Sequence, residues 1–337
     1  MLKHYKVDGT TKIKMDDQPT GAEGHKKHKE EIVAKTAANQ LQIQQYQDKL
    51  YAQAREGLII LIQARDAAGK DGTIKHVMSG VNPQGVDVYS FKTPTHAELA
   101  HDFLWRFNKA IPIRGKIAIF NRSYYEDVLI VKVRELWKNY QLPERLLKPS
   151  IIKNRYEQIR QYEEYLYQNG YRLVKIYLNV SADKQKERFL ERLERPEKNW
   201  KFSEADLAER ALWNEYTQAY EDAINATATK HNPWYIIPAD QKWYAHYLVS
   251  EVILKALKKI DPKYPQLSKD QIDKLSIYKD ALDHEKPIGT SKKSFVATKT
   301  ENAAAGKKEQ KAIEMVQALE EEVPEIAEVK EPEETAS

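Results

Sequence analysis

Residues 58–73 read LIILIQARDAAGKDGT, and this stretch decides the fold. Its first part is densely apolar, which is typical of a strand buried on both faces of a parallel sheet. Small residues follow, then Gly69 and Lys70, and a helical pattern begins near Gly72. When a buried strand, a loop of small residues and a helix follow one another in this way, the N–H groups of the loop and of the first helical turn bind phosphate oxygens. The lysine then reaches the outer phosphates. The stretch therefore predicts an α/β protein with a phosphate-binding loop.

The loop departs from the Walker A pattern G-x-x-x-x-G-K-[ST] at two positions, since Ala64 replaces the first glycine and Asp71 replaces the metal-binding Ser or Thr. Asp66 lies inside the loop, where a carboxylate suits an anion site only if a cation sits beside it. We therefore expect Asp66 to hold Mg²⁺. The small residues that let the backbone approach an anion are Ala67, Ala68 and Gly69. The alternative is a plain Gly-Lys turn between a strand and a helix.

The composition excludes several chemistries. The chain has 337 residues and no cysteine, which rules out disulfides, thiolate nucleophiles, thiolate zinc sites and iron–sulfur clusters. Its longest apolar run, residues 58–62, is far shorter than the roughly 20 residues of a membrane helix. The N-terminal stretch lacks the apolar segment of a secretory signal. We therefore expect a cytoplasmic protein with no membrane partner.

Charge is distributed unevenly along the chain. Residues 301–337 contain four Lys and eleven Glu, a net charge of −7. Because the whole chain carries +4, the first 300 residues sum to +11. A basic body indicates an anionic partner, and the alternative is a lysine-rich surface that is simply well solvated.

Strand and helix patterns alternate along the chain, which predicts a parallel sheet covered by helices. The expected strands are residues 57–64, 86–91, 116–120, 171–180 and 234–237. The expected helices are residues 28–50, a segment beginning near residue 72, and residues 96–108, 148–168, 183–194, 203–229 and 243–259. Ser203 is the expected cap of its helix, with Asp206 three residues later.

Three parts of the chain differ in composition. We expect residues 1–27 to form an N-terminal arm and residues 28–265 to form the phosphate-loop domain. Residues 266–337 have no sustained core pattern, so we expect a largely disordered tail, acidic at its end. Residues 307–321 are a candidate helix within that tail.

The segment after the strand at residues 116–120 carries further candidates. In phosphate-loop enzymes an acidic residue commonly ends such a strand and binds Mg²⁺ directly or through water. Here Asn121 takes that place, which keeps an acceptor oxygen and loses the charge. Arg122 follows and can clamp a phosphoryl group. Glu126 either contributes to the site or caps the helix that follows.

A row of cations begins in the helix expected at residues 183–194 and continues to the residue after it. Arg188, Arg192 and Arg195 are spaced i, i+4 and i+7, so they share one helical face. An arginine row on a mobile helix can close a lid over transferring phosphates. The alternative is a salt-bridged surface helix, because glutamates interleave with the arginines.

Together these segments resemble the polyphosphate kinase 2 family. The resemblance covers most of residues 32–259, and its most specific stretches are residues 64–77 (ARDAAGKDGTIKHV), 119–133 (IFNRSYYEDVLIVKV), 187–210 and 214–245. It is closest to the branch that phosphorylates nucleoside monophosphates as well as diphosphates. It implies a three-layer, thymidylate kinase-like fold with a parallel sheet and a helical lid around residues 183–210. It also implies Mg²⁺-dependent phosphoryl transfer between inorganic polyphosphate and adenine or guanine nucleotides, by a homo-oligomer. The sequence has no RNA-binding or helix-turn-helix pattern, so we expect no nucleic-acid partner.

Carried over by position, the resemblance implies roles for single residues. Asp66 and Asn121 stand at the metal positions, Lys70 is similar to the phosphate-loop lysine, and Arg122 to the phosphate clamp. The family pattern is Asp-Arg-Ser where this chain has Asn121-Arg122-Ser123. Loss of that carboxylate predicts impaired transfer, because metal charge stabilises the transition state.

The resemblance also implies two groups of binding residues. Arg188 and Arg192 look like lid arginines that face the polyphosphate path. Arg122, Glu126 and Lys132 look like nucleotide-binding residues, although the family usually has arginine where this chain has Lys132. Two other functions explain part of the pattern. One is an ATP-dependent nucleoside monophosphate kinase, and the other is a polyanion-binding protein without catalytic activity.

Overall fold

One six-stranded sheet organises the computed structural model, which describes residues 2–285. Its strands are β1 (Lys6–Val7), β2 (Gly57–Ala64), β3 (Val86–Ser90), β4 (Ile117–Asn121), β5 (Tyr171–Asn179) and β6 (Trp234–Pro238). They lie in the order β1-β6-β5-β2-β4-β3. All neighbours pair in parallel except β1, which pairs antiparallel with β6 at one edge.

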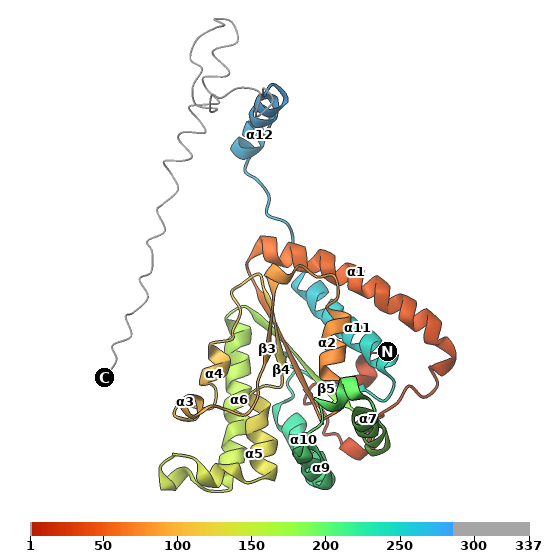
Figure 1. The fold of residues 1–337 in the computed structure, drawn as a ribbon. Helices are drawn as coiled ribbons and strands as arrows, with labels where there is room; N and C mark the ends of the chain where they lie inside the picture. The colour runs from red at the N-terminus through yellow and green to blue at the C-terminus, as the bar shows by residue number, and fades with distance from the viewer. Residues whose placement is uncertain (1, 286–337) are drawn as a thin grey trace, which may run out of the picture. The chain divides into compact units, whose positions relative to one another are not determined.

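Helices cover both faces of this sheet (Figure 1). They are α1 (Lys29–Gln53), α2 (Lys70–Val77), α3 (His96–Leu99), α4 (Trp105–Asn108), α5 (Ile130–Val133), α6 (Ser150–Gln168), α7 (Ala182–Glu194), α8 (Pro196–Asn199), α9 (Glu204–Ala211), α10 (Trp213–Thr227) and α11 (Lys242–Ile260). One core packs beneath α1, α2 and α11, and the other beneath α4, α6 and α10. These three layers confirm the expected α/β class.

Strand β2 explains why the apolar run appears in the sequence. All eight of its residues are buried, and it pairs with β4 on one side and β5 on the other. Ile60 and Ile62 enter the core beneath α2 and α11, whereas Ile59 and Leu61 enter the opposite core. A central strand with helices on both faces has no polar face, so apolar residues occupy consecutive positions.

Two expected helices are interrupted. Residues 96–108 form α3 and α4, because the Asp102 side chain accepts a hydrogen bond from Leu104 N and makes a turn between them. Residues 203–229 form α9 and α10, which meet at Leu212 with a ψ of 33°. Ser203 and Asp206 form the capping box that the spacing predicts.

The N-terminal segment packs against the sheet and helix α10. Residues 6 and 7 form β1, and Tyr5, Val7 and Met15 are buried. Asn225 of α10 accepts a hydrogen bond from Ile13 N and donates one to Ile13 O. The segment therefore adds an edge strand to the sheet, while the domain limits at residues 28 and 265 stay predictions.

A second unit begins at Pro265. Its described part contains α12 (Lys269–Asp283), none of whose residues is buried. The candidate helix at residues 307–321 lies outside the described residues. In residues 2–285, no helix combines the length and hydropathy that crossing a lipid bilayer requires.

A buried ion pair lies behind the segment that follows β4. Lys175 Nζ of β5 is 2.6 Å from Glu163 Oε2 of α6, and both side chains are almost fully buried. Tyr124 OH and Tyr125 OH donate to the other oxygen of Glu163, at 3.0 and 2.8 Å. Because these tyrosines come directly after Ser123, the pair fixes the position of the chain next to Arg122.

We expect Lys175→Met to destabilise the fold strongly, because it leaves the Glu163 carboxylate buried without its cation. Removing one partner of a buried ion pair typically costs about 3–5 kcal/mol. Urea unfolding measures the change. The control is Arg160→Met, which removes an exposed pair with Glu157 and should cost below about 1 kcal/mol. Equal losses in the two variants would contradict a structural role for the buried pair.

Two histidines stack where α2 meets α11. The rings of His76 and His246 lie 4.3 Å apart. Burial, His76 and Lys242 lower the pKa of His246 from 6.5 to about 4. Between these pH values the unfolded chain binds a proton at this position and the folded chain does not. Stability is therefore lost as the pH falls from 6.5 to 4.

We expect His246→Phe to flatten part of this pH dependence. The free energy of unfolding of the unaltered chain should fall by about 1–2 kcal/mol more than that of the variant, a value discounted for solvent screening of a partly exposed ring. Urea unfolding at pH 7, 5.5 and 4.5 measures this difference between the two proteins. The carboxylates contribute equally to the pH dependence of both, so their contribution cancels. Parallel pH curves would show that His246 takes no part.

Candidate active site

The loop between β2 and α2 leads into a helix whose N-terminal end has no side-chain cap. Gly69 occupies the N-cap position of α2 with a φ of 103°, and no side chain caps this end. Ala67 also has a positive φ, 58°. Such turns aim consecutive N–H groups at one point, which is where an anion binds. The expected phosphate loop is therefore present in shape.

Lys70 folds back over this loop. Its ammonium donates to Ala64 O at 3.1 Å and to Arg65 O at 3.4 Å. Burial and the neighbouring Arg122 lower its pKa, while the carboxylates of the site oppose this effect. Two carbonyl groups are weak partners for a cation, so a phosphate oxygen can replace them.

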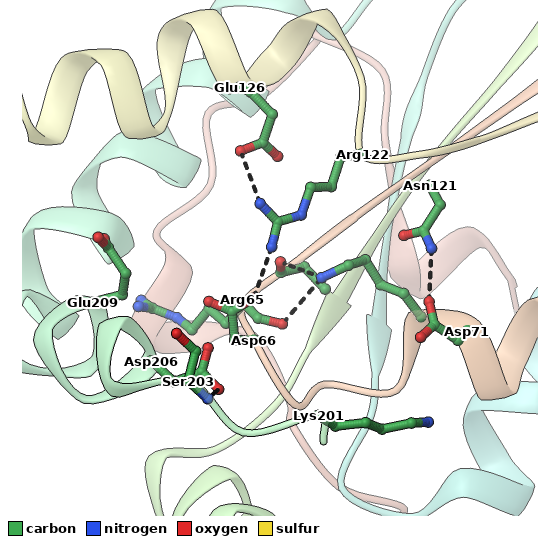
Figure 2. Close-up of polar contacts among 12 residues, drawn as sticks. Arg65, Asp66, Asp71, Asn121, Arg122, Glu126, Lys201, Ser203, Asp206 and Glu209 are labelled. Carbon is green, nitrogen blue, oxygen red and sulfur yellow. Dashed lines mark hydrogen bonds and ion pairs between the residues drawn. The ribbon is translucent and has the colours of Figure 1, made fainter. Parts of the chain in front are cut away.

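Strand pairing places the segment after β4 beside the loop. Ile62 of β2 is the register partner of Asn121 of β4, so both strands end at the same edge of the sheet. Arg122 has a φ of 65°, and Nη2 of its guanidinium lies 3.0 Å from Asp66 Oδ1. Its Nη1 lies 4.0 Å from Glu126 Oε2, so the guanidinium sits between two carboxylates (Figure 2). The structure thus brings together Asp66, Arg122 and Glu126.

Glu126 lies within the site in this structure. Its side chain is 19% exposed, and it comes from the short helical turn Tyr124–Val128. Burial raises the pKa of its carboxyl, while Arg122 and Lys70 oppose this effect. A contact with ligand stays a prediction for this residue.

Asn121 contacts a carboxylate on the opposite side of the loop. Its Nδ2 donates to Asp71 Oδ1 at 2.7 Å, and Asp71 lies in the first turn of α2 (Figure 2). The two expected metal residues therefore have different partners here, because Asp66 pairs with Arg122. The part of the chain that the structure describes contains no group of three acidic or histidine side chains placed to hold a metal ion.

The oxygen atoms of this edge fit a hard cation. Mg²⁺ is usually bound by one or two carboxylates together with substrate phosphates, not by a complete protein cage. Asp66, Asp71 and Asn121 supply such oxygens beside the phosphate loop. Their number and type therefore suit Mg²⁺ bound jointly with phosphate.

Arg188 of α7 is buried and contacts backbone. Its guanidinium donates to Ala67 O and Ala68 O at 2.9 and 2.8 Å. It also donates to Ala239 O and Asp240 O, at 2.7 and 3.1 Å, after the end of β6. In this conformation the side chain links the carbonyl groups of the phosphate loop to the segment that follows β6.

The other two arginines of the row have separate surroundings. Arg192 donates to Asp206 Oδ2 at 3.2 Å and to Lys201 O at 3.1 Å, within the segment formed by α7, α8 and α9. Arg195 is exposed and pairs with Glu191 and Glu197. Helical spacing placed the three on one face, but each meets a different environment. Contact of Arg188 and Arg192 with polyphosphate stays a prediction.

Lys132 of α5 forms an ion pair with Asp222 of α10. The pair joins two helices that lie next to each other. Its role in nucleotide binding stays a prediction.

Two residues near the loop were missed by the sequence analysis. Arg65 stacks on the Trp213 ring, 3.8 Å from its centroid, and donates to Thr217 Oγ1 at 2.6 Å. This contact ties the loop to the start of α10. Asp206 has a raised pKa because of burial and the nearby Asp66 carboxylate. Its capping position suggested a local role only, and no spacing signal pointed to the loop.

A phosphate loop at the carboxyl edge of a parallel sheet is typical of the phosphate-loop class of proteins, which bind phosphate groups there. The match of residues 26–265 to the family model described as Polyphosphate kinase 2 (PPK2) is more specific. The chain belongs to the polyphosphate kinase 2 family.

Curated relatives and a solved structure agree with this assignment. An ADP-polyphosphate phosphotransferase of Rhodopseudomonas palustris is 42% identical over 266 residues, which cover 78% of this chain and 92% of that protein. An AMP/ADP-polyphosphate phosphotransferase of Meiothermus ruber is 41% identical over 267 residues, covering 79% and 96%. The crystal structure of polyphosphate kinase 2 from Arthrobacter aurescens TC1 matches with a TM-score of 0.71 and 35% identity, covering 82% of this chain and 95% of that chain. The fold class is confirmed, and the chain is a phosphotransferase.

We expect Arg188→Met to lower the free energy of unfolding by about 2–4 kcal/mol in the absence of ligand, because four carbonyl groups lose a charged donor. Urea unfolding of the protein without ligand tests this. The matched control is Arg195→Met at the residue directly after α7, whose exposed pairs with Glu191 and Glu197 should contribute below about 1 kcal/mol. Unchanged stability of Arg188→Met would instead favour a side chain reserved for phosphate.

Proposed function

We propose that this protein transfers phosphoryl groups between inorganic polyphosphate and nucleotides, in an Mg²⁺-dependent reaction. The acceptors are AMP, which becomes ADP, and ADP, which becomes ATP, or their guanine equivalents. The observation that carries the proposal is the meeting of Lys70, Arg122 and Asp66 at the uncapped start of α2. The names of the relatives supply the donor and the acceptors.

The proposed transfer needs alignment and charge compensation more than acid–base chemistry. A terminal phosphate oxygen of the nucleotide attacks the terminal phosphorus of polyphosphate. The bridging P–O bond breaks, and the electron pair leaves with the shortened polyphosphate. Lys70 and Arg122 compensate the negative charge of the phosphate oxygens, and the N–H groups of α2 orient them. When bound, Mg²⁺ would supply further positive charge between the phosphates.

Charge supports polyphosphate as the donor. The first 300 residues carry +11, which favours capture of a long linear polyanion over a small nucleotide. The carboxylate inside the loop, Asp66, fits a site that holds a cation together with phosphate.

Position 121 bears on the rate of this reaction. Taken alone, Asn121 predicts a slower transfer than an aspartate would give, because the strand end then contributes no negative charge near the metal. The Asp71 carboxylate, which accepts a hydrogen bond from Asn121, also lies at this strand end.

We expect Lys70→Met to reduce transfer from long-chain polyphosphate to AMP and to ADP about 10²–10³-fold, because a phosphate oxygen loses its ammonium partner. Formation of ADP and ATP is measured with Mg²⁺ present. The matched control is Lys35→Met, which removes an exposed ammonium from α1 and should leave the rate unchanged.

The same assay separates the rival functions. Transfer from ATP to AMP without transfer from polyphosphate would identify a nucleoside monophosphate kinase. Salt-dependent binding of polyphosphate without turnover would identify a polyanion-binding protein. Either result would contradict the proposed function.

A further inference from the structure

The contact between Asn121 and Asp71 joins two positions at which the chain departs from the usual phosphate-loop pattern. The residue after the loop lysine is ordinarily Ser or Thr, whose neutral oxygen binds the metal. The residue that ends the neighbouring strand is ordinarily acidic. Here the helix position holds Asp71 and the strand position holds Asn121, 2.7 Å apart between Nδ2 and Oδ1.

We propose that Asp71 supplies the carboxylate that this site lacks at position 121, so that the two positions have exchanged roles. The inference rests on the proposed function and deepens it, because it names a further residue toward Mg²⁺. The usual pattern has a carboxylate at the end of the strand and a neutral oxygen at the start of the helix. Here the neutral oxygen is on β4 and the carboxylate is on α2, so the same two kinds of ligand are present. Asn121 is then a partner of Asp71, not an inactivating substitution.

The hydrogen bond explains why an amide suits position 121. Two carboxylates at the distance of Asn121 and Asp71 would repel each other, because like charges this close are unfavourable. The Asn121 amide instead donates a hydrogen bond to Asp71 Oδ1 and so fixes the position of this carboxylate. Asp71 is exposed, so its second oxygen has room for a cation that arrives with phosphate.

A local role for Asp71 is the competing explanation. An acidic residue in the first turn of a helix is stabilised by the partial positive charge there. That role predicts a change in stability when the carboxylate is removed, and no change in metal affinity. The two explanations therefore differ in a readout other than activity.

Exchanging the two side chains tests the proposal. The variants are Asp71→Asn, Asn121→Asp, and the double variant that carries both changes. Asp48→Asn, an exposed carboxylate on α1, is the matched control. The affinity for Mn²⁺ is measured by electron paramagnetic resonance with inorganic tripolyphosphate present. The rate of transfer from polyphosphate to AMP is measured in parallel.

Asp71→Asn should weaken Mn²⁺ binding about 10–100-fold and slow transfer at least as much, because no carboxylate remains at the pair. The double variant should recover both quantities to within a few-fold of the unaltered chain. Asn121→Asp alone should not be faster than the unaltered chain, and Asp48→Asn should match it.

Three results would overturn the inference: Mn²⁺ affinity unchanged in Asp71→Asn, no recovery in the double variant, or faster transfer by Asn121→Asp alone. The last result would support impairment by Asn121. If no form transfers phosphate from polyphosphate while the Mn²⁺ affinities follow the expected order, the proposed function fails and the exchanged pair stands. If transfer occurs and Asp71→Asn leaves both quantities unchanged, the proposed function stands and the exchanged pair fails.

Discussion

The position of β2 between β4 and β5 is the constraint on which the candidate site depends. Parallel pairing brings the carboxyl ends of neighbouring strands to one edge, so the loop after β2 and the segment after β4 meet there. Residues 64 and 121 are far apart in the chain, yet Arg122 reaches Asp66 because of this register. The apolar residues of β2 therefore serve the site as well as the core, because they keep this strand at the centre of the sheet.

Two kinds of contact surround the site. Buried side chains hold the backbone of the site in place, whereas side chains next to the phosphate loop have partners that a ligand can replace. Lys175 and Glu163 hold the tyrosines after Arg122 through a fully buried network. Arg188 holds the carbonyl groups of the phosphate loop. By contrast, the hydrogen bonds of the Lys70 ammonium within residues 2–285 go to two carbonyl oxygens. This division lets side chains change partners on binding while the backbone that positions them stays fixed.

The sequence predicts an element of the fold correctly where its residue pattern is compatible with a single kind of structure. Strand β2 has the bounds expected from the sequence, residues 57–64, because only a central strand accommodates so dense an apolar segment. The break at Leu212 was not predicted, because it follows from tertiary packing and leaves no Gly or Pro in the sequence. Spacing placed Arg188 on the expected helix face but could not show that this face meets the phosphate loop. The Asp71 contact depends on strand register, which a single sequence does not display.

The internal ion pairs of the site couple anion binding to cation binding. Without ligand, Arg122 and Asp66 neutralise each other at 3.0 Å. In the proposed reaction a phosphate competes with Asp66 for the guanidinium, since a phosphate group offers it bidentate contacts. The carboxylate that loses Arg122 then needs another cation, and Mg²⁺ arriving with the phosphate meets that need. If the proposed reaction holds, such a site would bind metal weakly without phosphate and more strongly with it, because phosphate frees Asp66 from its ion pair with Arg122.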